Sequence, residues 1–220
     1  MKIFVIGANG QIGRHLVKDI VAEGNEVVAG IRKNSQASFF EDLGATTAPL
    51  DLEYDDINDI SEKIKDADKV VFTAGSGGHT GADQTIIIDL DGAVKSIEAS
   101  KIAGTKHFVL VSSFDTRRSA FEGDLKPYTI AKHYADEHLR NANIPYTIVH
   151  PGALTNDDAI GTVTLAEEVE RGKIPRKDVA TVLVEVLNND EKIGQEFQVV
   201  SGDVEIKEAV DQFNHHKGVL

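Results

Sequence analysis

Two side chains that could act together in proton transfer, Tyr128 and Lys132, are four positions apart in a segment with helical periodicity. Residues at this spacing project from the same face of a helix. A phenol titrates near pH 10, and a neighbouring ammonium group favours its ionised form. Tyr128 is therefore a candidate general acid for a carbonyl oxygen, or a base in the reverse direction. The alternative is a tyrosine that packs in the core and a lysine that is solvated, a pattern that also occurs in ordinary helices.

Two serines precede this helix, at the carboxyl end of a predicted strand. Ser112 and Ser113 follow the apolar stretch 107–111, and a hydroxyl at such a strand end could orient the oxygen of a bound substrate through a hydrogen bond. Ser113 is the first candidate and Ser112 the second. A charged loop, 113–126, separates both from Tyr128, so the choice between them stays open.

Three glycines, Gly7, Gly10 and Gly13, follow an apolar strand at 3–6 and open a segment with helical periodicity. The N–H groups and the dipole at a helix N-terminus attract phosphate. One glycine would allow the tight turn, one the close approach of backbone to pyrophosphate, and one the close contact of helix and strand. The spacing is G-x-x-G-x-x-G instead of G-x-G-x-x-G. The order of strand, glycine turn and helix predicts a dinucleotide site.

The residue that ends the second predicted strand indicates which dinucleotide is bound. A carboxylate about 20 residues beyond the glycines favours NAD, because it accepts hydrogen bonds from the ribose hydroxyls. This chain has Arg32 and Lys33 there instead. A guanidinium group binds phosphate through two hydrogen bonds and keeps its charge. The sequence therefore favours NADP(H) over NAD(H), the alternative being a solvated Arg–Lys pair on a loop.

Further cofactor contacts are expected where the next strands end. Asp51 could accept a hydrogen bond from the adenine amine and Leu52 could pack on the ring, although Asp51 could equally cap a helix. Ala74 and Gly75 would let the cofactor approach the backbone closely. The predicted cofactor-binding residues are Gly7, Asn9, Gly10, Gln11, Ile12, Gly13, Arg32, Lys33, Asp51, Leu52, Ala74, Gly75, Ser76, Lys132, Pro151 and Gly152.

Apolar strands and amphipathic helices alternate along the chain. Strands are predicted at 3–6, 25–31, 45–50, 69–73, 107–112, 145–149, 163–165 and 196–201. Helices are predicted after Gly10 and at 35–43, 56–65, 83–103, 127–141, 175–188 and 206–213. The helix at 83–103 should turn Ile86, Leu90, Ala93, Val94 and Ile97 toward the core. This order predicts βαβ units with right-handed crossovers, forming a doubly wound parallel sheet covered on both faces.

Composition excludes several classes of site. The chain has no cysteine, which rules out disulfides and thiolate metal sites. A formal net charge of −13 argues against nucleic acid or an anionic membrane as the partner. We see no signal peptide and no apolar stretch of the roughly 18 residues that span a bilayer, and we expect a cytoplasmic protein. His133 and His138 lack the i,i+4 spacing of a zinc helix and His215-His216 fits a frayed end, so no metal site is expected.

Together these motifs resemble the short-chain dehydrogenase/reductase superfamily. The motifs are Gly7-x-x-Gly10-x-x-Gly13, Asp51-Leu52, Ala74-Gly75, Val111-Ser112-Ser113, Tyr128-Thr-Ile-Ala-Lys132 and His150-Pro-Gly152. Over nearly its whole length the chain looks like the compact atypical members, related to NmrA-like and biliverdin-reductase-B-like proteins and to NAD-dependent epimerases/dehydratases. The resemblance implies a Rossmann-type α/β fold, an NAD(P) cofactor, and a Lys132 that holds the nicotinamide ribose. Asp89 stands where many relatives carry asparagine.

We therefore expect a single domain, 1–220, in which 153–220 forms a small substrate-side lobe. The expected function is NADP(H)-dependent reduction of a small carbonyl or quinone-like substrate, in a pocket built from 76–82, 114–126 and 153–165. Arg117 and Arg118 could bind an acidic group of that substrate or be solvated. One alternative is an NADP-sensing regulator that binds a protein partner without chemistry. A sugar epimerase or dehydratase is disfavoured by the short C-terminal segment.

Overall fold

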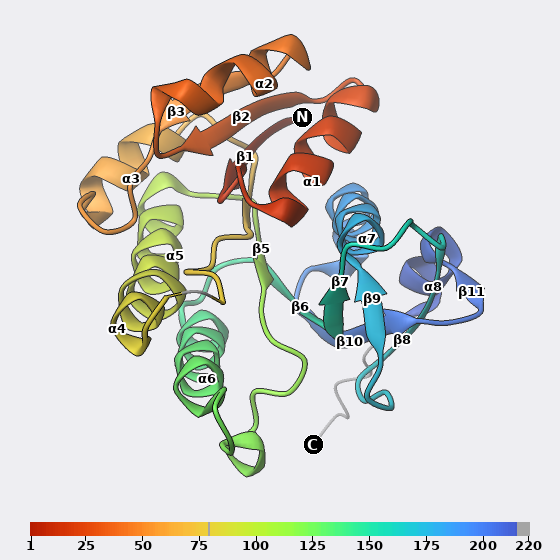
Figure 1. The fold of residues 1–220 in the computed structure, drawn as a ribbon. Coiled ribbons are helices and arrows are strands. Elements are labelled where there is room, and N and C mark those ends of the chain that lie inside the picture. Colours follow the sequence, from red (N-terminus) through yellow and green to blue (C-terminus); the bar gives the residue numbers. More distant parts are fainter. Residues whose placement is uncertain (79, 215–220) are drawn as a thin grey trace.

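A twisted nine-stranded sheet forms the centre of the structure, which is a computed structural model that describes residues 1–78 and 80–214 (Figure 1). The predicted His215-His216 end lies outside the described residues. The strands in chain order are β1 (Lys2–Ile6), β2 (Glu26–Ile31), β3 (Thr46–Pro49), β4 (Lys69–Phe72), β5 (His107–Val111), β6 (Tyr146–Pro151), β7 (Ala153–Thr155), β8 (Thr162–Ala166), β9 (Lys173–Pro175), β10 (Gln195–Ser201) and β11 (Val204–Glu205). Their order across the sheet is β11-β8-β10-β6-β5-β4-β1-β2-β3.

The strands from β3 to β10 in this order all run parallel, and β8 is antiparallel to β10. The helices between them are α1 (Gln11–Ala22), α2 (Ala37–Asp42), α3 (Ile57–Ile64), α4 (Ala82–Gln84), α5 (Gly92–Ala103), α6 (Lys126–Asn141), α7 (Arg176–Asn188) and α8 (Ile206–Gln212). Strands that alternate with helices in this way form the Rossmann-type fold predicted from the sequence.

Two apolar clusters cover the two faces of the sheet. Alternate side chains of a strand point to opposite faces, so Ile3 and Val5 join the cluster under α1, α2, α7 and α8, whereas Phe4 and Ile6 join the cluster under α3, α5 and α6. Both faces are therefore buried, which explains why the central strands are apolar at nearly every position.

The predicted helix at 83–103 contains a π-helical segment, Thr85–Asp91, between α4 and α5. Ala93 and Ile97 face the core as predicted, but the prediction for Ile86 was wrong, because this side chain is 57% exposed. The i→i+5 hydrogen bonds of a π-helix change the phase of the residues that precede α5. The changed phase turns Thr85 and Asp89 inward instead.

Residues after β6 extend the same sheet. The predicted strands at 163–165 and 196–201 and the helix at 175–188 are present, and α7 packs directly on α1. Buried side chains of α7 lie in one cluster with those of α1. The short strands β7 and β9, which pair in parallel as a second small sheet, were not predicted. The C-terminal segment thus shares the core of the N-terminal half.

Two further expectations concern metals and membranes. Within residues 1–78 and 80–214, no three potential metal ligands lie close enough together to hold an ion. The two histidines of α6 that lack zinc-ligand spacing contact other side chains. His133 packs against the rings of Phe121 and Tyr134, and His138 forms a hydrogen bond with Glu98. None of the helices in this part of the chain is both long and apolar enough to cross a bilayer.

Candidate functional site

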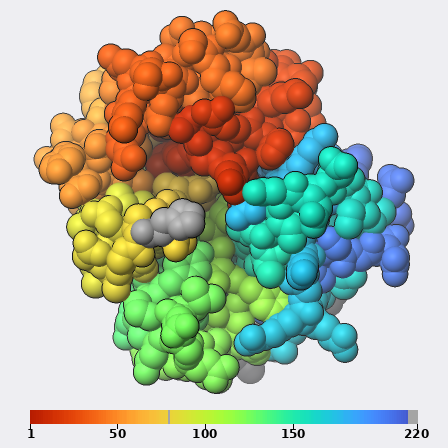
Figure 2. Space-filling view, viewed as in Figure 1, coloured from red at the N-terminus to blue at the C-terminus, as the bar shows by residue number. Residues whose placement is uncertain are grey.

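A cavity of about 1100 Å³ opens at the carboxyl ends of β1, β4 and β5, where the strand order reverses direction. Doubly wound sheets bind ligands at this position. Its walls come from the glycine turn after β1, from residues 73–78 and 80–82, from the start of α6, and from Leu154, Asn156 and Arg176. All three segments predicted to build the pocket contribute to it. Figure 2 shows the hollow where the N-terminal, green and teal segments meet.

The glycine turn fits a dinucleotide for steric reasons that the structure makes explicit. Gly7 has a φ of +83°, and a Cβ there would lie 2.5 Å from the Ala74 nitrogen. A Cβ on Gly13 would lie 2.4 Å from the Gly7 carbonyl oxygen, so α1 could not approach the turn so closely. Gly10 is the N-cap of α1, and no side chain of the described residues bonds to the helix N-terminus. Its first N–H groups are thereby left for an anion.

Tyr128 and Lys132 both line the cavity, from the first two turns of α6. This helix begins at Lys126, one residue before the predicted Pro127. The Lys132 Nζ lies 5.7 Å from the centre of the Tyr128 ring and donates to the Val111 carbonyl oxygen at 3.3 Å. Burial by itself would lower the pKa of Lys132, but Tyr128, Asp89 and Asp136 outweigh it and raise this pKa. Lys132 is thus a cation at neutral pH.

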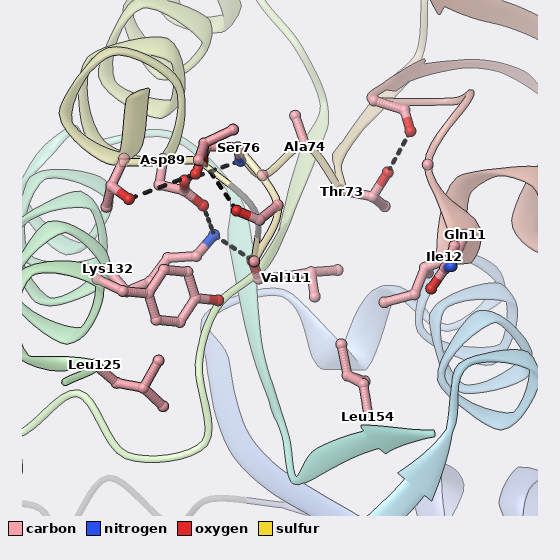
Figure 3. Close-up of a pocket in the computed structure, with 18 of the residues that line it drawn as sticks. Gln11, Ile12, Thr73, Ala74, Ser76, Asp89, Val111, Leu125, Lys132 and Leu154 are labelled. Atoms are coloured by element: carbon pink, nitrogen blue, oxygen red, sulfur yellow. Dashed lines mark hydrogen bonds and ion pairs between the residues drawn. The ribbon is translucent and has the colours of Figure 1, made fainter. Parts of the chain in front are cut away.

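Asp89 provides the counter-charge and is the acidic residue that sequence reasoning left out of the site. Its Oδ1 lies 3.5 Å from the Lys132 Nζ, and its Oδ2 accepts a hydrogen bond from the Ser76 N–H (Figure 3). Both side chains of the pair are almost completely buried. The signal in the sequence is a lone carboxylate within the apolar run Ile86-Ile87-Ile88-Asp89-Leu90.

The structure brings Ser112 to the cavity, and Ser113 is not part of its lining. The Ser112 Oγ bonds to the Asp136 Oδ2 at 2.9 Å, and Thr116 donates to the same oxygen at 2.7 Å. Ser113 instead uses its carbonyl oxygen, which lies 2.6 Å from the His150 Nδ1. The geometry therefore favours Ser112, the second candidate, as the hydroxyl that could face a substrate.

A buried polar network supports this serine from behind the cavity. Burial raises the pKa of Asp136, although His150 and the two hydroxyls act in the opposite direction. Burial would lower the pKa of His150, but its bond to Glu196 and its proximity to Asp136 raise it overall. Glu196 also accepts two hydrogen bonds from Arg140. Burial opposes ionisation of Glu196, yet these partners lower its pKa to about 2. The network joins α6, β6 and β10.

Replacing Glu196 by glutamine is expected to lower the free energy of unfolding at pH 7 by about 2 kcal/mol, allowing for partial solvent exposure. The folded-state pKa of about 2 lies below the ordinary value of 4.5. The carboxylate therefore stabilises the fold above pH 4.5, and this contribution is lost as the pH falls toward 2. Urea denaturation at several pH values should show the two proteins converging over this interval.

Glu137→Gln is the matched control for that measurement. Glu137 also pairs with Arg140, but its side chain is 48% exposed against 33% for Glu196 and accepts one hydrogen bond from Arg140 instead of two, so its loss should cost less than about 0.5 kcal/mol. A cost for Glu196→Gln that stayed constant from pH 7 to pH 2 would contradict the role assigned to the carboxylate.

Arg32 and Lys33 are exposed at the end of β2, beyond the lining of the cavity. Both backbone N–H groups donate to the Gln36 Oε1 at 3.1 Å, which holds the turn that carries them. The Arg32 guanidinium forms no hydrogen bond or ion pair with the residues that the structure describes. It therefore remains available to a phosphate group.

Other predicted cofactor residues divide into two groups. Ala74, Gly75 and Ser76 line the cavity, together with Gly7, Gly10, Gln11 and Ile12. Asn9, Gly13, Asp51, Leu52, Pro151 and Gly152 do not line it. The Asn9 side chain accepts a hydrogen bond from Arg14. The Asp51 carboxylate accepts one from the Glu53 N–H within its own turn. Asp51 does not cap α3, because the N-cap of that helix is Asp56. Leu52 is buried in the core, Pro151 pairs with β10, and Gly152 packs against Gly172.

The two loop arginines proposed for an acidic substrate lie outside the cavity lining. Arg117 is bound by Asp115 and Glu168, and Arg118 lies over the Tyr134 ring and donates to its hydroxyl. The arginine that does line the cavity is Arg176, which sequence reasoning missed.

Comparison with known proteins agrees with this geometry. A family model described as NAD(P)H-binding matches residues 7–190. A Bacillus subtilis protein named "Uncharacterized sugar epimerase YhfK" is 42% identical over 96% of this chain and 99% of its own. A Bacillus halodurans structure, provisionally assigned as an NAD-dependent epimerase/dehydratase, has a TM-score of 0.91 and 38% identity over 97% of this chain and 100% of that one. The oxidoreductase YlbE of Lactococcus lactis has a TM-score of 0.88 and 31% identity over 98% and 100%.

The family match covers most of the chain, including the glycine turn, Asp89, Tyr128 and Lys132. The relatives extend it over nearly the full length. The chain therefore belongs to the NAD(P)H-binding family, within the atypical short-chain dehydrogenase/reductase superfamily that its motifs predict.

Proposed function

We propose that this protein is an NADPH-dependent reductase of a small carbonyl or quinone-like compound. Its family supports NAD(P)-dependent dehydrogenase or reductase chemistry in general. The observation that carries the narrower proposal is the placement of Tyr128 and a buried, charged Lys132 in one cavity with an uncapped helix N-terminus framed by glycines.

In this proposal, some residues of the cavity bind the cofactor and the substrate, and others transfer a proton. A nicotinamide cofactor bound in the cavity would supply the hydride. The Tyr128 hydroxyl donates a proton to the substrate oxygen, and the nearby Lys132 ammonium stabilises the phenolate left behind. Asp89 keeps Lys132 in place, and Ser112, whose hydroxyl proton is donated to Asp136, forms part of the wall beside the substrate. Gly7, Gly10 and the first N–H groups of α1 would hold the diphosphate of the cofactor.

Preference for NADPH is the part of the proposal that depends on Arg32. Replacing Arg32 by glutamine is expected to weaken NADPH binding by about 10- to 100-fold, the worth of a charge-assisted contact with phosphate, while NADH binding changes less than about twofold. The measurement is a titration followed by the fluorescence of the bound nicotinamide, which has little background because the chain contains no tryptophan.

Lys33→Gln serves as the comparison variant on the same turn. Its ammonium is a point charge without the paired donors of a guanidinium, so a smaller loss of NADPH binding is expected. Equal weakening of NADPH and NADH by Arg32→Gln would show that Arg32 does not bind the 2′-phosphate.

A second candidate, a sugar epimerase, follows from the names of the relatives in Bacillus subtilis and Bacillus halodurans. An epimerase returns the hydride within each cycle, so it consumes no cofactor, whereas a reductase oxidises one NADPH for each substrate molecule. Incubation with NADPH and a panel of aldehydes, ketones and quinones separates the two. Loss of NADPH in proportion to product supports the reductase.

Epimerisation of nucleotide-sugars with no net change in cofactor would instead support the second candidate. Tight NADPH binding without turnover on either panel would favour the regulatory alternative.

A further inference from the structure

We propose that Arg176 binds an oxyanion of the substrate, so that the preferred substrates are apolar carbonyl compounds that carry a carboxylate. The proposal rests on the proposed function for the presence of a carbonyl group at Tyr128. It also deepens that function, because it names the charged group that the compound carries beside an apolar body.

Two paired strands place Arg176 in the wall of the cavity. Thr155 of β7 lies opposite Pro175 of β9, so the next residues of the two strands, Asn156 and Arg176, emerge side by side. Both line the cavity, and the Arg176 Nη1 donates to the Asn156 Oδ1 at 2.8 Å. One end of the guanidinium is thereby fixed by a neutral amide, which orients the group without neutralising it.

The positive charge of Arg176 has no ion-pair partner among the residues that the structure describes, although the chain carries a net charge of −13. Of the acids that line the cavity, Asp89 is paired with Lys132, and Asp124 makes no ion pair with Arg176. The donors of a guanidinium that remain unpaired bind an anion favourably, and its planar fork matches a carboxylate.

The surroundings of Arg176 indicate the rest of the ligand. Leu154, two residues before Asn156, and Leu125, three residues before Tyr128, line the same cavity and lie in the lower half of the view in Figure 3. Gln11 and Ile12 lie on one side of that view, and Lys132 and Asp89 on the other. A molecule between these walls would place an apolar body against the leucines, a carbonyl near Tyr128 and an anion at Arg176.

An oxyanion at Arg176 could come from the substrate or from the diphosphate of the cofactor. The diphosphate already has a site at the glycine turn and the start of α1, which favours the substrate as the source. The experiment therefore measures both kinds of binding.

The test compares two probes that share an aldehyde and an aromatic ring, 4-formylbenzoate and its methyl ester, of which only the first carries a carboxylate. Each is titrated into the complex of the full chain with NADP⁺, which has no hydride to transfer to the aldehyde, and binding is measured by isothermal titration calorimetry, so turnover does not disturb the readout. The unchanged protein should bind the acid at least about 10-fold more tightly than the ester. Arg176→Gln should remove this difference and leave the affinity for the ester and for the coenzyme within about twofold.

Two further variants control the result. Arg176→Lys keeps the charge but not the paired donors, so it should retain part of the preference for the acid. Arg118→Gln removes an arginine outside the cavity and should retain all of it. The proposal is overturned if the unchanged protein binds acid and ester equally, or if Arg176→Gln weakens coenzyme binding instead. If the unchanged protein binds the acid more tightly than the ester but oxidises no NADPH with any carbonyl compound, the reductase function is overturned and the role of Arg176 in binding is not.

Discussion

Replacing Tyr128 by phenylalanine is expected to lower kcat by about 10²- to 10⁴-fold, the contribution of a positioned general acid. The variant keeps the ring beside the Lys132 Nζ and removes only the hydroxyl. Because the proposed site for the cofactor's diphosphate is the glycine turn, to which Tyr128 does not belong, the Kd of NADPH should change less than about twofold. The loss should therefore appear in kcat and kcat/KM, with the fold and the cofactor site unchanged.

Tyr134→Phe is the matched control, because Tyr134 lies on the same helix outside the cavity lining. Its hydroxyl accepts a hydrogen bond from Arg118, so its removal should leave kcat unchanged. Both variants are assayed with saturating NADPH and the carbonyl or quinone that the unchanged protein reduces fastest. Tyr128→Phe with more than about half of the original kcat would show that another group supplies the proton.

Local sequence predicts the strands and helices of this fold because each central strand is apolar on both faces and each helix has one apolar side. The π-helical segment escapes such prediction. Its existence depends on packing, which determines whether Ile86 or Asp89 turns inward, and the periodicity of the sequence alone favours Ile86. Strands of two or three residues, such as β7 and β9, are also too short to show a pattern.

The sequence predicts those residues of the candidate site whose type and spacing along the chain are themselves typical of a known chemistry. Tyr128, Lys132 and the glycines at 7 and 10 line one cavity. Residues that act through a partner distant in sequence were not found. Asp89 becomes part of the site only because the π-helix turns it toward Lys132. Arg176 does so only because β9 pairs with a strand that carries Asn156 at the next position.

Asp136 also acts through residues distant in sequence, because it accepts hydrogen bonds from Ser112 and Thr116. Lys132, Asp136 and Arg140 are spaced by four residues along one side of α6. Lys132 and Asp136 are buried, whereas the Arg140 side chain is 30% exposed. Only Lys132 reaches the cavity, and the other two fix Ser112 and the β6–β10 edge behind it. The cavity-lining side of α6 is thus continuous with a polar network behind it.

Replacing Asp89 by alanine is expected to lower the free energy of unfolding by about 3–5 kcal/mol, the cost of leaving a buried charge without its partner. Lys132 would keep only its bond to the Val111 carbonyl oxygen, and the Ser76 N–H would lose its acceptor. Asp89→Asn retains an acceptor for Ser76 and removes only the charge, so it should cost less. Urea denaturation at pH 7 without cofactor measures all of these proteins.

The double variant Asp89→Leu/Lys132→Met provides the decisive comparison, because both charges are replaced by apolar groups. Its free energy of unfolding should exceed that of Asp89→Ala, since no buried charge is left unpaired. The same protein should have no turnover, because the ammonium beside Tyr128 is gone. Recovered stability without recovered activity would show that the pair is retained for chemistry at Tyr128 and not for the fold. A free energy of unfolding of the double variant no higher than that of Asp89→Ala would contradict a coupled ion pair.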